Sequence, residues 1–462
     1  MIFDPPLPRG GEIAIVGLGR SGLAATELLR TSGASVYVSD ASDSPTVREA
    51  AERAVQMGAT ADTGKHDLQR IARATILVAS PGIGPAAPPL KAAAGKGVPI
   101  VSEVEIGLRA LRKVKYIAVT GTNGKSTTTA LIAHLLRGLG ANAVEAGNIG
   151  TPLCSYALSK SPPEWISLEM SSFQLHDTPS INPEVGVLTN LSADHLDRYD
   201  SVRQYYADKA LLFRNASDRS NWVINADDSQ VEKMVQGIRG RTYRFSVTKP
   251  ADAFLRRTEA SQGAELVLKG LNVLKSSELP VLGQHNVANV LSALLAVSIA
   301  HPKFQKADAL AMLADAVRSF KGLPHRLEIV SEKNCVLWIN DSKATNVSST
   351  LVAVQSMTRP FVLLLGGKHK GESYSSLAGP MKRLVRKVIA YGESADLIEK
   401  DLKSAVDVEK AGNDFESVLE IARKNAKSGD AVLLSPACSS YDMFLNFEER
   451  GDRFREIVGT MK

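Results

Sequence analysis

The segment Thr120–Thr127, TGTNGKST, constrains the fold more than any other part of this chain. It follows the apolar run Tyr116–Thr120, which is typical of a buried strand, and precedes apolar residues at helical spacing over 126–139. Gly121 and Gly124 let the backbone turn tightly between the two elements, so that N–H groups can face phosphate oxygens. The sequence therefore predicts a strand, a phosphate-binding loop and a helix in succession.

The side chains of this loop supply the other parts of a nucleotide site. Lys125 adds a fixed cation, and the Ser126 hydroxyl is placed to hold Mg²⁺. The first glycine of the usual P-loop is replaced by Val119, so GTNGKST is a compressed form. The predicted ligand is a nucleotide.

Length and composition predict a soluble globular protein of about three domains. The 462 residues are 44% hydrophobic and 23% charged, with a mean hydropathy of -0.05. No apolar run approaches the roughly 18 residues of a membrane span, and the N-terminus lacks a secretory signal. Cys154, Cys335 and Cys438 are odd in number and far apart, which indicates a cytoplasmic protein with three buried, unpaired thiols.

The net charge of +6 and the isoelectric point near 9.0 raise the question of nucleic acid. The basic residues are spread out, however, and the densest cluster, Lys382-Arg383 with Arg386-Lys387, has the spacing of a solvated helix face. A mild positive excess suits small anionic substrates equally well. Nucleic acid is therefore the weaker interpretation, and no membrane partner is expected.

Short apolar runs separated by amphipathic helices predict an α/β fold with parallel sheets covered on both faces. We expect a Rossmann-like domain over 1–111, a central P-loop-type ATPase domain over 112–321 and a second Rossmann-like domain over 322–462. A more irregular, β-rich segment over 240–282 leads into a helix near Gln284. The predicted strands are Glu12–Val16, Ser35–Ser39, Thr75–Ala79, Tyr116–Thr120, Trp165–Glu169, Glu184–Thr189, Cys335–Ile339, Phe361–Leu365, Val388–Tyr391 and Ala431–Leu434.

A second glycine-rich turn follows the first predicted strand. Gly17, Gly19 and Gly22 match the dinucleotide fingerprint, and Asp40 stands at the end of the next strand. NAD is one candidate ligand, and UDP is another, because both present a pyrophosphate to a helix N-terminus. The glycines alone also fit a purely structural role in strand–helix packing.

Acidic residues and a histidine gather at strand ends of the central block. Glu169 ends a strand, which is the usual place for a carboxylate that reaches Mg²⁺. Asp194, His195 and Asp197 crowd together after the next strand, and a histidine flanked by acids in this position favours a ligand role. Lys209, by its local sequence, is expected on a helix surface.

Seven motifs follow one another along the chain: GTNGKST, LEMSSFQL, NLSADHLDRY, GQHNVANV, GLPHR, NDSKATN and SPACSSYDMF. Together they resemble the motifs of the Mur ligases of peptidoglycan synthesis, in the same order, over about residues 12 to 456. Within that family, the GLGRSG, SPGI and NDSKATN segments are similar to those of the members that add D-glutamate.

The resemblance implies an ATP-dependent ligase that joins D-glutamate to UDP-N-acetylmuramoyl-L-alanine through an acyl phosphate, with ADP and phosphate as products. Two Mg²⁺ ions are implied, because a carboxylate attacking a triphosphate brings two anions together. By similarity, Ser126 and Glu169 hold one ion, and His195 and a carbamylated Lys209 hold the other. Lys125, His195 and Lys209 are the implied catalytic residues, and an unmodified amine at Lys209 remains the alternative.

The resemblance also implies three sets of substrate contacts. The glutamate set leaves Lys368 as an alternative to Lys370, which aligns better. The ATP contacts are Gly121, Thr122, Asn123, Gly124, Lys125, Ser126, Thr127, Asn286, Asn289, Arg326 and Asp341. The UDP-sugar contacts are Gly19, Arg20, Ser21, Asp40, Asn148 and His195. The glutamate contacts are Lys343, Thr345, Lys370, Ser440 and Phe447.

Three other functions compete with this interpretation. An NAD-dependent oxidoreductase would account for the Rossmann-like domain over 1–111 but would leave GTNGKST and Glu169 without a function. A nucleotide-driven switch would account for the P-loop but not for the two Rossmann-like domains over 1–111 and 322–462. A sister ligase that adds another amino acid, or that adds glutamate to folate, is the nearest alternative, and SPGI and NDSKATN argue against it. The partners expected are the three small-molecule substrates, with the protein a monomer.

Overall fold

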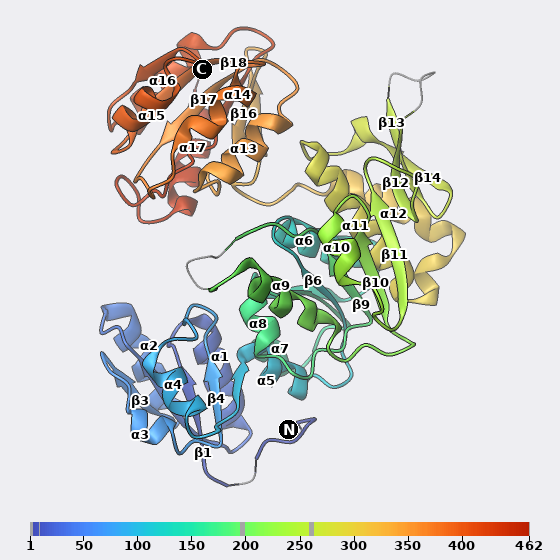
Figure 1. Ribbon diagram of the computed structural model, residues 1–462, viewed down its shortest axis with the longest axis vertical. Helices are drawn as coiled ribbons and strands as arrows, with labels where there is room; N and C mark the ends of the chain where they lie inside the picture. The colour runs from blue at the N-terminus through green and yellow to red at the C-terminus, as the bar shows by residue number, and fades with distance from the viewer. Residues whose placement is uncertain (1–2, 9, 195–198, 258–262, 462) are drawn as a thin grey trace. The chain divides into compact units, whose positions relative to one another are not determined.

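The computed structural model describes residues 3–8, 10–194, 199–257 and 263–461. The chain divides into two compact units, Met1–Glu278 with Ala288–Arg318 and Leu279–Val287 with Ser319–Lys462. Within the described ranges, the strands form sheets of five, nine and six strands, each combined with helices (Figure 1). The predicted α/β class is therefore confirmed.

The first sheet is entirely parallel, with strand order β3-β2-β1-β4-β5. Alternate residues of its strands face two separate cores: Ile13 and Ile15 pack into one, Ala14 and Val16 into the other. Both faces are therefore covered, as expected of a parallel sheet. Its strands are β1 (Glu12–Val16), β2 (Ser35–Asp40), β3 (Thr60–Thr63), β4 (Ile76–Ala79) and β5 (Ile100–Ser102). Its helices are α1 (Arg20–Thr31), α2 (Pro45–Gln56), α3 (Leu68–Ile71), α4 (Pro88–Ala94) and α5 (Glu103–Ala110).

The second sheet is parallel in its centre and antiparallel at one edge. Its order is β14-β13-β12-β11-β10-β9-β6-β8-β7, and β12, β13 and β14 pair antiparallel. The P-loop strand β6 lies between β9 and β8, so two neighbouring strands end beside the loop that follows it. Its strands are β6 (Lys115–Thr120), β7 (Ala143–Gly147), β8 (Trp165–Glu169), β9 (Val185–Leu188), β10 (Asn221–Asn225), β11 (Arg241–Ser246), β12 (Ala253–Arg257), β13 (Ala264–Leu268) and β14 (Leu271–Lys275).

The helices that accompany the second sheet include the one that begins at the P-loop. This helix, α6 (Lys125–Gly138), follows Gly124 and is buried along most of its first three turns. The others are α7 (Leu153–Ala157), α8 (Ser172–His176), α9 (Val202–Ala210), α10 (Ser229–Met234), α11 (Gln284–Ala300) and α12 (Ala307–Ser319). Short 3₁₀ turns are η1 (Leu211–Phe213), η2 (Ser276–Glu278) and η3 (Pro302–Gln305).

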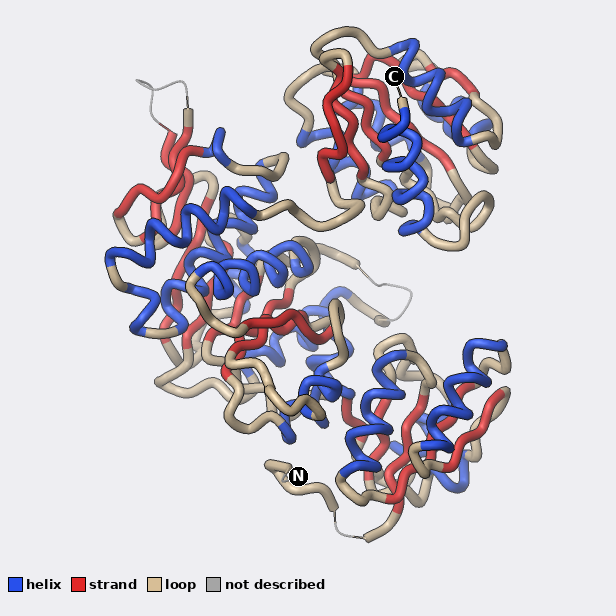
Figure 2. Tube along the Cα trace, turned by 180° about the vertical axis from the view of Figure 1, so that it is seen from behind, coloured by secondary structure: helices blue, strands red, loops and turns tan. Residues whose placement is uncertain are grey.

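The third sheet has the order β15-β16-β20-β17-β18-β19 and is parallel except for the β15–β16 pair. Phe361, Leu363 and Leu365 face one core, and Val362 and Leu364 face the other. Figure 2 separates these strands and helices by colour. The strands are β15 (Glu328–Lys333), β16 (Val336–Asn340), β17 (Phe361–Gly366), β18 (Val385–Tyr391), β19 (Val408–Lys410) and β20 (Ala431–Leu434). The helices are α13 (Val347–Ser356), η4 (Tyr374–Leu377), α14 (Ala378–Met381), α15 (Ala395–Leu402), α16 (Phe415–Asn425) and α17 (Phe447–Thr460).

Two local expectations were wrong. The basic cluster is not a helix face, because α14 ends before it and Arg386 and Lys387 belong to strand β18. Arg386 pairs with Asp430, and Lys387 pairs with Asp407 and Glu409, so nearby carboxylates balance both charges.

No helix in the described part of the chain has the length and apolar character needed to cross a bilayer.

Cys335 is the second exception, because it is exposed and not buried. It stands at a turn with a positive φ of 60°, directly before β16, so its side chain is not part of the strand that the sequence predicted. Cys154 and Cys438 are buried, as expected. All three are free thiols.

Candidate functional site

The P-loop adopts the strand–loop–helix arrangement that its glycines predict. Gly121 and Gly124 have positive φ angles of 143° and 81°, values that L-residues with side chains rarely adopt. A Cβ atom at Gly121 would collide with Thr189 Oγ1, and one at Gly124 would collide with Asn289 Oδ1. Space and backbone conformation both require glycine at these two positions.

The loop is held by the segment that follows β9. The Asn123 N–H donates to Asn190 Oδ1 at 2.8 Å, and Asn190 Nδ2 donates to the Asn123 carbonyl at 2.9 Å. Thr122 N–H donates to the Asn190 carbonyl at 2.9 Å, and the Thr122 hydroxyl donates to the Ser192 carbonyl at 3.1 Å. Asn190 and Ser192 therefore hold the loop in place, a role that the sequence analysis missed although both lie in NLSADHLDRY.

Two lysine side chains meet at one carbonyl of the loop. Lys125 Nζ donates to the Gly121 carbonyl at 2.9 Å and to the Thr122 carbonyl at 2.7 Å. Lys209 Nζ donates to the same Gly121 carbonyl at 2.7 Å and lies 4.7 Å from the centre of the Tyr205 ring. The expectation of a surface lysine at 209 was wrong, because its residue is only 1% exposed.

The environment of Lys209 favours its neutral form. Burial lowers the pKa of the Lys209 amine well below its usual value, and the nearby charge of Lys125 lowers it further. Tyr205 stands four residues earlier on α9, so both side chains lie on one helix face, and its hydroxyl donates to Thr122 Oγ1 at 3.3 Å. The i, i+4 spacing of Tyr205 and Lys209 was the available sequence signal for this pair.

Glu169 lies at the end of β8 with one carboxylate oxygen uncommitted. Its Oε1 accepts a hydrogen bond from Asn148 Nδ2 at 2.8 Å. For Oε2, which is buried, the described residues offer no hydrogen-bond partner. Ser126, in the first turn of α6, is 9% exposed, and Glu169 is 1% exposed. A buried carboxylate oxygen without a donor is a suitable ligand for a cation such as Mg²⁺.

The acid and histidine cluster after β9 is only partly described. Asp194 is exposed. His195 and Asp197 lie outside the described residues. Within the described ranges, no group of three His, Cys, Asp or Glu side chains has the arrangement of a preformed metal site.

The glycine-rich turn after β1 is built around a carboxylate. A Cβ atom at Gly22 would overlap the Gly17 carbonyl oxygen, so the third glycine allows α1 to approach the end of the strand. The Leu18 N–H donates to Asp40 Oδ2 at 2.8 Å, and the Ser42 N–H donates to Asp40 Oδ1 at 2.9 Å. Asp40 thus holds two backbone segments at this turn.

The other residues of the predicted UDP-sugar set lie in the same unit. Gly19 caps the N-terminus of α1, and Arg20 and Ser21 begin that helix. Arg20 donates to the Gly150 carbonyl at 2.8 Å, which connects the turn to the segment that follows β7. Asn148 belongs to that segment. Arg20 and Glu169 therefore each form a hydrogen bond with the segment 148–150 that follows β7.

Asn286 and Asn289 both belong to α11, but their contacts differ. Asn289 Oδ1 accepts from the Thr128 hydroxyl at 3.3 Å, which joins α11 to α6 beside the P-loop. Asn286 Nδ2 donates to the Leu282 carbonyl at 2.7 Å and belongs to the second unit. Both residues are buried.

Asp341, in the second unit, is a buried carboxyl group at the end of β16. Its Oδ1 accepts from the Leu327 N–H at 3.1 Å, and its Oδ2 accepts from the Ser435 hydroxyl at 2.8 Å. Burial raises the pKa of Asp341 to about 7, although both hydrogen bonds and the nearby Arg326 oppose the rise. Arg326 directly precedes the residue that donates to Asp341.

Four of the predicted glutamate contacts form two pairs in the second unit. Lys343 Nζ lies 4.3 Å from the centre of the Phe447 ring, a cation–π distance. Lys370 Nζ donates to Thr345 Oγ1 at 3.4 Å. Lys368 pairs through its backbone with Ser439, and its side chain is exposed. The contact with Thr345 favours Lys370 over Lys368 as the side chain in this cluster.

Cys438 and Ser440 occupy the loop after β20, and both are buried. Cys438 Sγ lies 2.9 Å from the Tyr374 hydroxyl and 3.2 Å from the Ser394 hydroxyl. Burial raises the pKa of the Cys438 thiol, so a thiolate nucleophile is disfavoured. A nearby open cleft of about 790 Å³, lined by Asp414, Asp442 and other acidic residues, contains none of the predicted substrate contacts.

Three family models match consecutive parts of this chain. They are the Mur ligase MurD-like N-terminal domain over residues 11–102, the Mur ligase middle domain over 119–297 and the Mur ligase glutamate ligase domain over 325–438. A protein from Pelotomaculum thermopropionicum, named UDP-N-acetylmuramoylalanine–D-glutamate ligase, is 36% identical, and the match covers 98% of each chain. The chain belongs to the Mur ligase family.

Other Mur ligases extend this comparison. A second relative named UDP-N-acetylmuramoylalanine–D-glutamate ligase, from Desulfatibacillum aliphaticivorans, is 34% identical over 98% of this chain and 99% of its own. The crystal structure of UDP-N-acetylmuramate–alanine ligase MurC from Thermotoga maritima matches with a TM-score of 0.61 and 21% identity, over 98% of this chain and all of the other. MurF ligase from Thermotoga maritima, in complex with ADP, matches with a TM-score of 0.59 and 17% identity, over 92% and 94%. These two structures share the Mur ligase fold with the chain.

Proposed function

We propose that this chain is the ATP-dependent ligase that joins D-glutamate to UDP-N-acetylmuramoyl-L-alanine, in the cytoplasmic synthesis of peptidoglycan precursors. The observation that carries the proposal is the match to ligases of that name over 98% of the chain, at 36% and 34% identity. Enzymes of this family use ATP and Mg²⁺. The products are the extended UDP-sugar peptide, ADP and phosphate.

The reaction proceeds in two transfers. An oxygen of the L-alanine carboxylate attacks the γ-phosphorus of ATP, and the bond to the β–γ bridging oxygen breaks, so ADP leaves and an acyl phosphate forms. The amine of D-glutamate then attacks the acyl carbon and loses a proton, and inorganic phosphate leaves. The first transfer brings two anions together, so fixed positive charge is needed where they meet.

Lys125 supplies that charge in the P-loop. Its ammonium hydrogen bonds to the Gly121 and Thr122 carbonyls, which hold it at the loop. Phosphate oxygens are stronger acceptors for an ammonium group than neutral carbonyls, because such bonds are charge-assisted. Gly121, Thr122, Asn123, Gly124, Ser126 and Thr127 complete the phosphate cradle in this proposal, with Asn286, Asn289, Arg326 and Asp341 as further ATP contacts.

In this proposal Ser126 and Glu169 hold one Mg²⁺ ion, and Lys209 with His195 would hold a second. The buried Glu169 Oε2 supports the first site, because a cation would satisfy it. When bound, Mg²⁺ supplies positive charge that offsets the repulsion between the carboxylate and ATP. His195 lies outside the described residues, so its role rests on the family resemblance.

Lys209 acts as a carbamate in this proposal. Its neutral amine is the form that reacts with CO₂, and burial together with Lys125 favours that form. The nitrogen adds to CO₂ and loses a proton, so the product is an anionic oxygen ligand beside the Lys125 ammonium, in place of a neutral amine. Lys125 and Lys209 share one carbonyl acceptor, which makes this change of charge favourable.

The remaining site residues bind the other two substrates. The turn at Gly19, Arg20 and Ser21, with Asp40, receives the uridine diphosphate, and Asn148 and His195 serve the reacting end of the UDP-sugar. Lys343, Thr345, Lys370 and Ser440 donate to the two carboxylates of glutamate, and Phe447 lies along its aliphatic stem. Lysine or diaminopimelate would place an ammonium group beside Lys343 and Lys370, a contact that excludes them.

The organisation of the chain into domains over 1–111, 112–321 and 322–462, and its monomeric state, are part of the same proposal. Sedimentation of the purified protein at several concentrations tests the second point. A mass that rises with concentration above 49.4 kDa contradicts a monomer.

Phosphate release from ATP tests the reaction. UDP-N-acetylmuramoyl-L-alanine should support release with D-glutamate and poorly with L-glutamate, D-aspartate or lysine. Lys370→Ala should raise the KM for glutamate far more than that for ATP, while Lys368→Ala should change it little. Equal turnover with lysine contradicts the proposed acceptor, and an unchanged glutamate KM in the Lys370 variant contradicts the contact. NADH that competes with the UDP-sugar for binding would instead support a dehydrogenase.

A further inference from the structure

The turn that carries Arg326 has an unusual backbone. His325 and Leu327, on either side of Arg326, have positive φ angles of 62° and 44°. Side chains with a Cβ atom disfavour this left-handed conformation, which persists only where surrounding contacts hold it. Two such residues flank Arg326, a proposed ATP contact, so specific contacts must hold this turn in its conformation.

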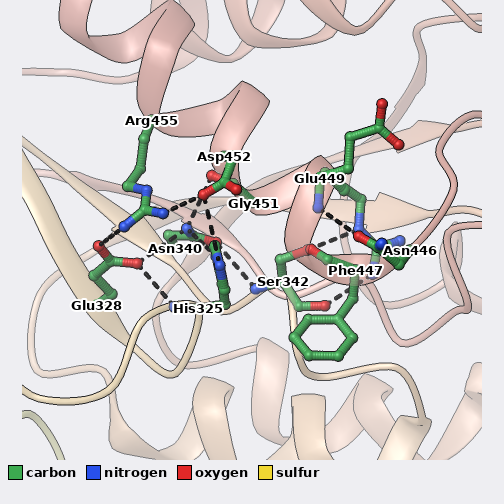
Figure 3. Close-up of polar contacts among 11 residues, drawn as sticks. His325, Glu328, Asn340, Ser342, Asn446, Phe447, Glu449, Gly451, Asp452 and Arg455 are labelled. Atoms are coloured by element: carbon green, nitrogen blue, oxygen red, sulfur yellow. Dashed lines mark hydrogen bonds and ion pairs between the residues drawn. The ribbon is translucent and has the colours of Figure 1, made fainter. Parts of the chain in front are cut away.

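Two carboxyl groups hold the backbone on both sides of Arg326. The His325 N–H donates to Glu328 Oε2 at 2.8 Å, and the Leu327 N–H donates to Asp341 Oδ1 at 3.1 Å. Glu328 is itself oriented by Arg455, whose Nη1 donates to Glu328 Oε1 at 3.1 Å (Figure 3). The main chain on both sides of the arginine is therefore held by the side chains of Glu328, on β15, and of Asp341, directly after β16.

Asn340 connects this turn to α17. Its residue is 0% exposed, and its Nδ2 lies 3.1 Å from each of three acceptors: His325 Nδ1, Glu328 Oε2 and the Gly451 carbonyl. An amide nitrogen has two hydrogens, so these contacts are shared among the three acceptors. In Figure 3 the Asn340 side chain lies among all three of these residues.

Helix α17 lies close to the His325 imidazole at Gly451. A Cβ atom at Gly451 would overlap His325 Nδ1, so only glycine allows the ring to lie this close to α17. Burial lowers the pKa of His325, and the nearby Arg455 lowers it further, so the ring is neutral and Nδ1 can accept from Asn340. Asp452 Oδ1 stands 3.7 Å from Nε2 on the other side of the ring.

The same group of contacts reaches the proposed glutamate site. The Lys343 N–H donates to the His325 carbonyl at 3.1 Å, and the Ser342 N–H donates to Asn340 Oδ1 at 3.1 Å. The Ser342 hydroxyl donates to the Phe447 carbonyl at 2.8 Å. The backbone that carries Lys343 and Phe447 is therefore held by the residues that also hold the Arg326 turn.

We propose that Glu328 and Asn340 are positioning residues that hold Arg326 and the Ser342–Lys343 loop in a fixed position relative to each other. The inference rests on the proposed function, in which Arg326 contacts ATP and Lys343 contacts glutamate. Neither Glu328 nor Asn340 has to touch a substrate. Loss of either side chain releases both loops together, so affinity for ATP and for the acceptor falls in the same variant.

Steady-state kinetics of Glu328→Gln and Asn340→Ala test this inference. Each loses hydrogen bonds involving a charged or buried group, so the KM values for both ATP and D-glutamate should rise at least about tenfold. The KM for UDP-N-acetylmuramoyl-L-alanine, which the first unit binds in this proposal, should stay near the wild-type value. Glu332→Gln is the matched control, because Glu332 lies on the same strand, has a 55% exposed side chain and only meets Arg359 at 3.5 Å.

Circular dichroism and thermal unfolding establish that each variant is folded, and Glu328→Gln, which preserves size, serves if Asn340→Ala does not fold. A folded variant that raises only one of the two KM values, or neither, overturns the shared positioning role. Arg326→Ala separates this inference from the proposed function, because it should raise the KM for ATP and leave that for glutamate near normal. An unchanged ATP KM in Arg326→Ala refutes the ATP contact itself, and the proposed role of Glu328 and Asn340 with it.

Discussion

The two glycine-rich turns of the first unit share a backbone plan and differ in charge. Each joins a parallel strand to a helix through glycines with positive φ angles, 103° at Gly17 and 143° at Gly121. In the first turn the Leu18 N–H donates to the carboxylate of Asp40. In the second, the amines of Lys125 and Lys209 both donate to the Gly121 carbonyl.

This difference shows that a glycine-rich turn by itself does not determine which ligand binds there. Glycines allow the backbone to come close to a pyrophosphate in both places. The groups beside the turns differ in origin: Asp40 comes from the end of β2, whereas the second turn leads into its own Lys125 and is also reached by Lys209 from α9. A negative group beside the first turn and lysines beside the second are consistent with a nucleotide sugar at one and ATP phosphates at the other.

The largest effect is expected from removing the cation of the second turn. Lys125→Ala should lower kcat by about 10²–10³-fold or more, because a preorganised charge on a transferring phosphate is worth several kcal/mol. Thermal unfolding should stay close to that of the wild type. Lys160→Ala, an exposed lysine of the same unit, is the control and should retain full activity. Near-normal turnover by folded Lys125→Ala protein overturns the P-loop assignment.

Lys209→Ala should be nearly as severe, and it should be partly reversible. A short carboxylic acid in the buffer can occupy the vacated position and restore activity, since it supplies the anionic oxygen that a carbamate would. Because the pKa of Lys209 is lowered, its amine is neutral at a lower pH than that of an ordinary lysine. Labelled CO₂ should therefore give a carbamate carbonyl signal near neutral pH that is absent from the variant. Failure of both experiments leaves Lys209 an unmodified amine.

A smaller effect distinguishes two glycines of the first turn. Gly22→Ala should lower the free energy of unfolding by about 1–3 kcal/mol, because its Cβ would overlap the Gly17 carbonyl oxygen and α1 would have to move. Gly19→Ala should cost less than about 1 kcal/mol, since Gly19 has an ordinary φ of −74° and open space around it. Urea unfolding of the two variants provides the comparison. Equal stability would show that the close approach of helix and strand is not required.

The smallest effect is expected from the carboxylate beside the first turn. Asp40→Ala removes two backbone hydrogen bonds, so binding of the UDP-sugar should weaken by roughly 5–10-fold, about 1–1.4 kcal/mol. The KM for ATP should not change. Asp43→Ala is the control, because Asp43 lies in the same loop region but pairs with the exposed Arg48. A shift in the ATP KM of equal size would mean that the two turns do not bind different substrates.

Much of the fold could be predicted because its parallel strands are short and apolar on both faces. The strands Glu12–Val16, Trp165–Glu169 and Ala431–Leu434 were predicted at their observed bounds. The antiparallel edge strand β15 was not predicted, because none of its residues is fully buried and its sequence, EIVSEK, has little apolar character. Residues 386–387 were predicted to lie on a helix face with residues 382–383. They lie in strand β18, and a spacing of three to four residues between basic pairs occurs both on exposed helices and near the ends of strands.

The amino-acid sequence by itself determined the local geometry. Gly121 and Gly124 allow the tight P-loop turn, because glycine readily adopts the positive φ angles found there and residues with side chains do not. The near-continuous apolar runs of the central strands determined that both faces would be buried. These features depend on neighbours within a few residues, which a sequence displays directly.

Only the tertiary structure decided the electrostatics of the candidate site. The burial of Lys209 against the Gly121 carbonyl joins residues 88 positions apart, and the use of Asp40 by Leu18 joins residues 22 positions apart. The buried oxygen of Glu169 and the contacts of Asn340 with α17 likewise depend on how separate segments pack. Burial and nearby charge set the pKa of such groups, and both quantities exist only once distant parts of the chain have come together.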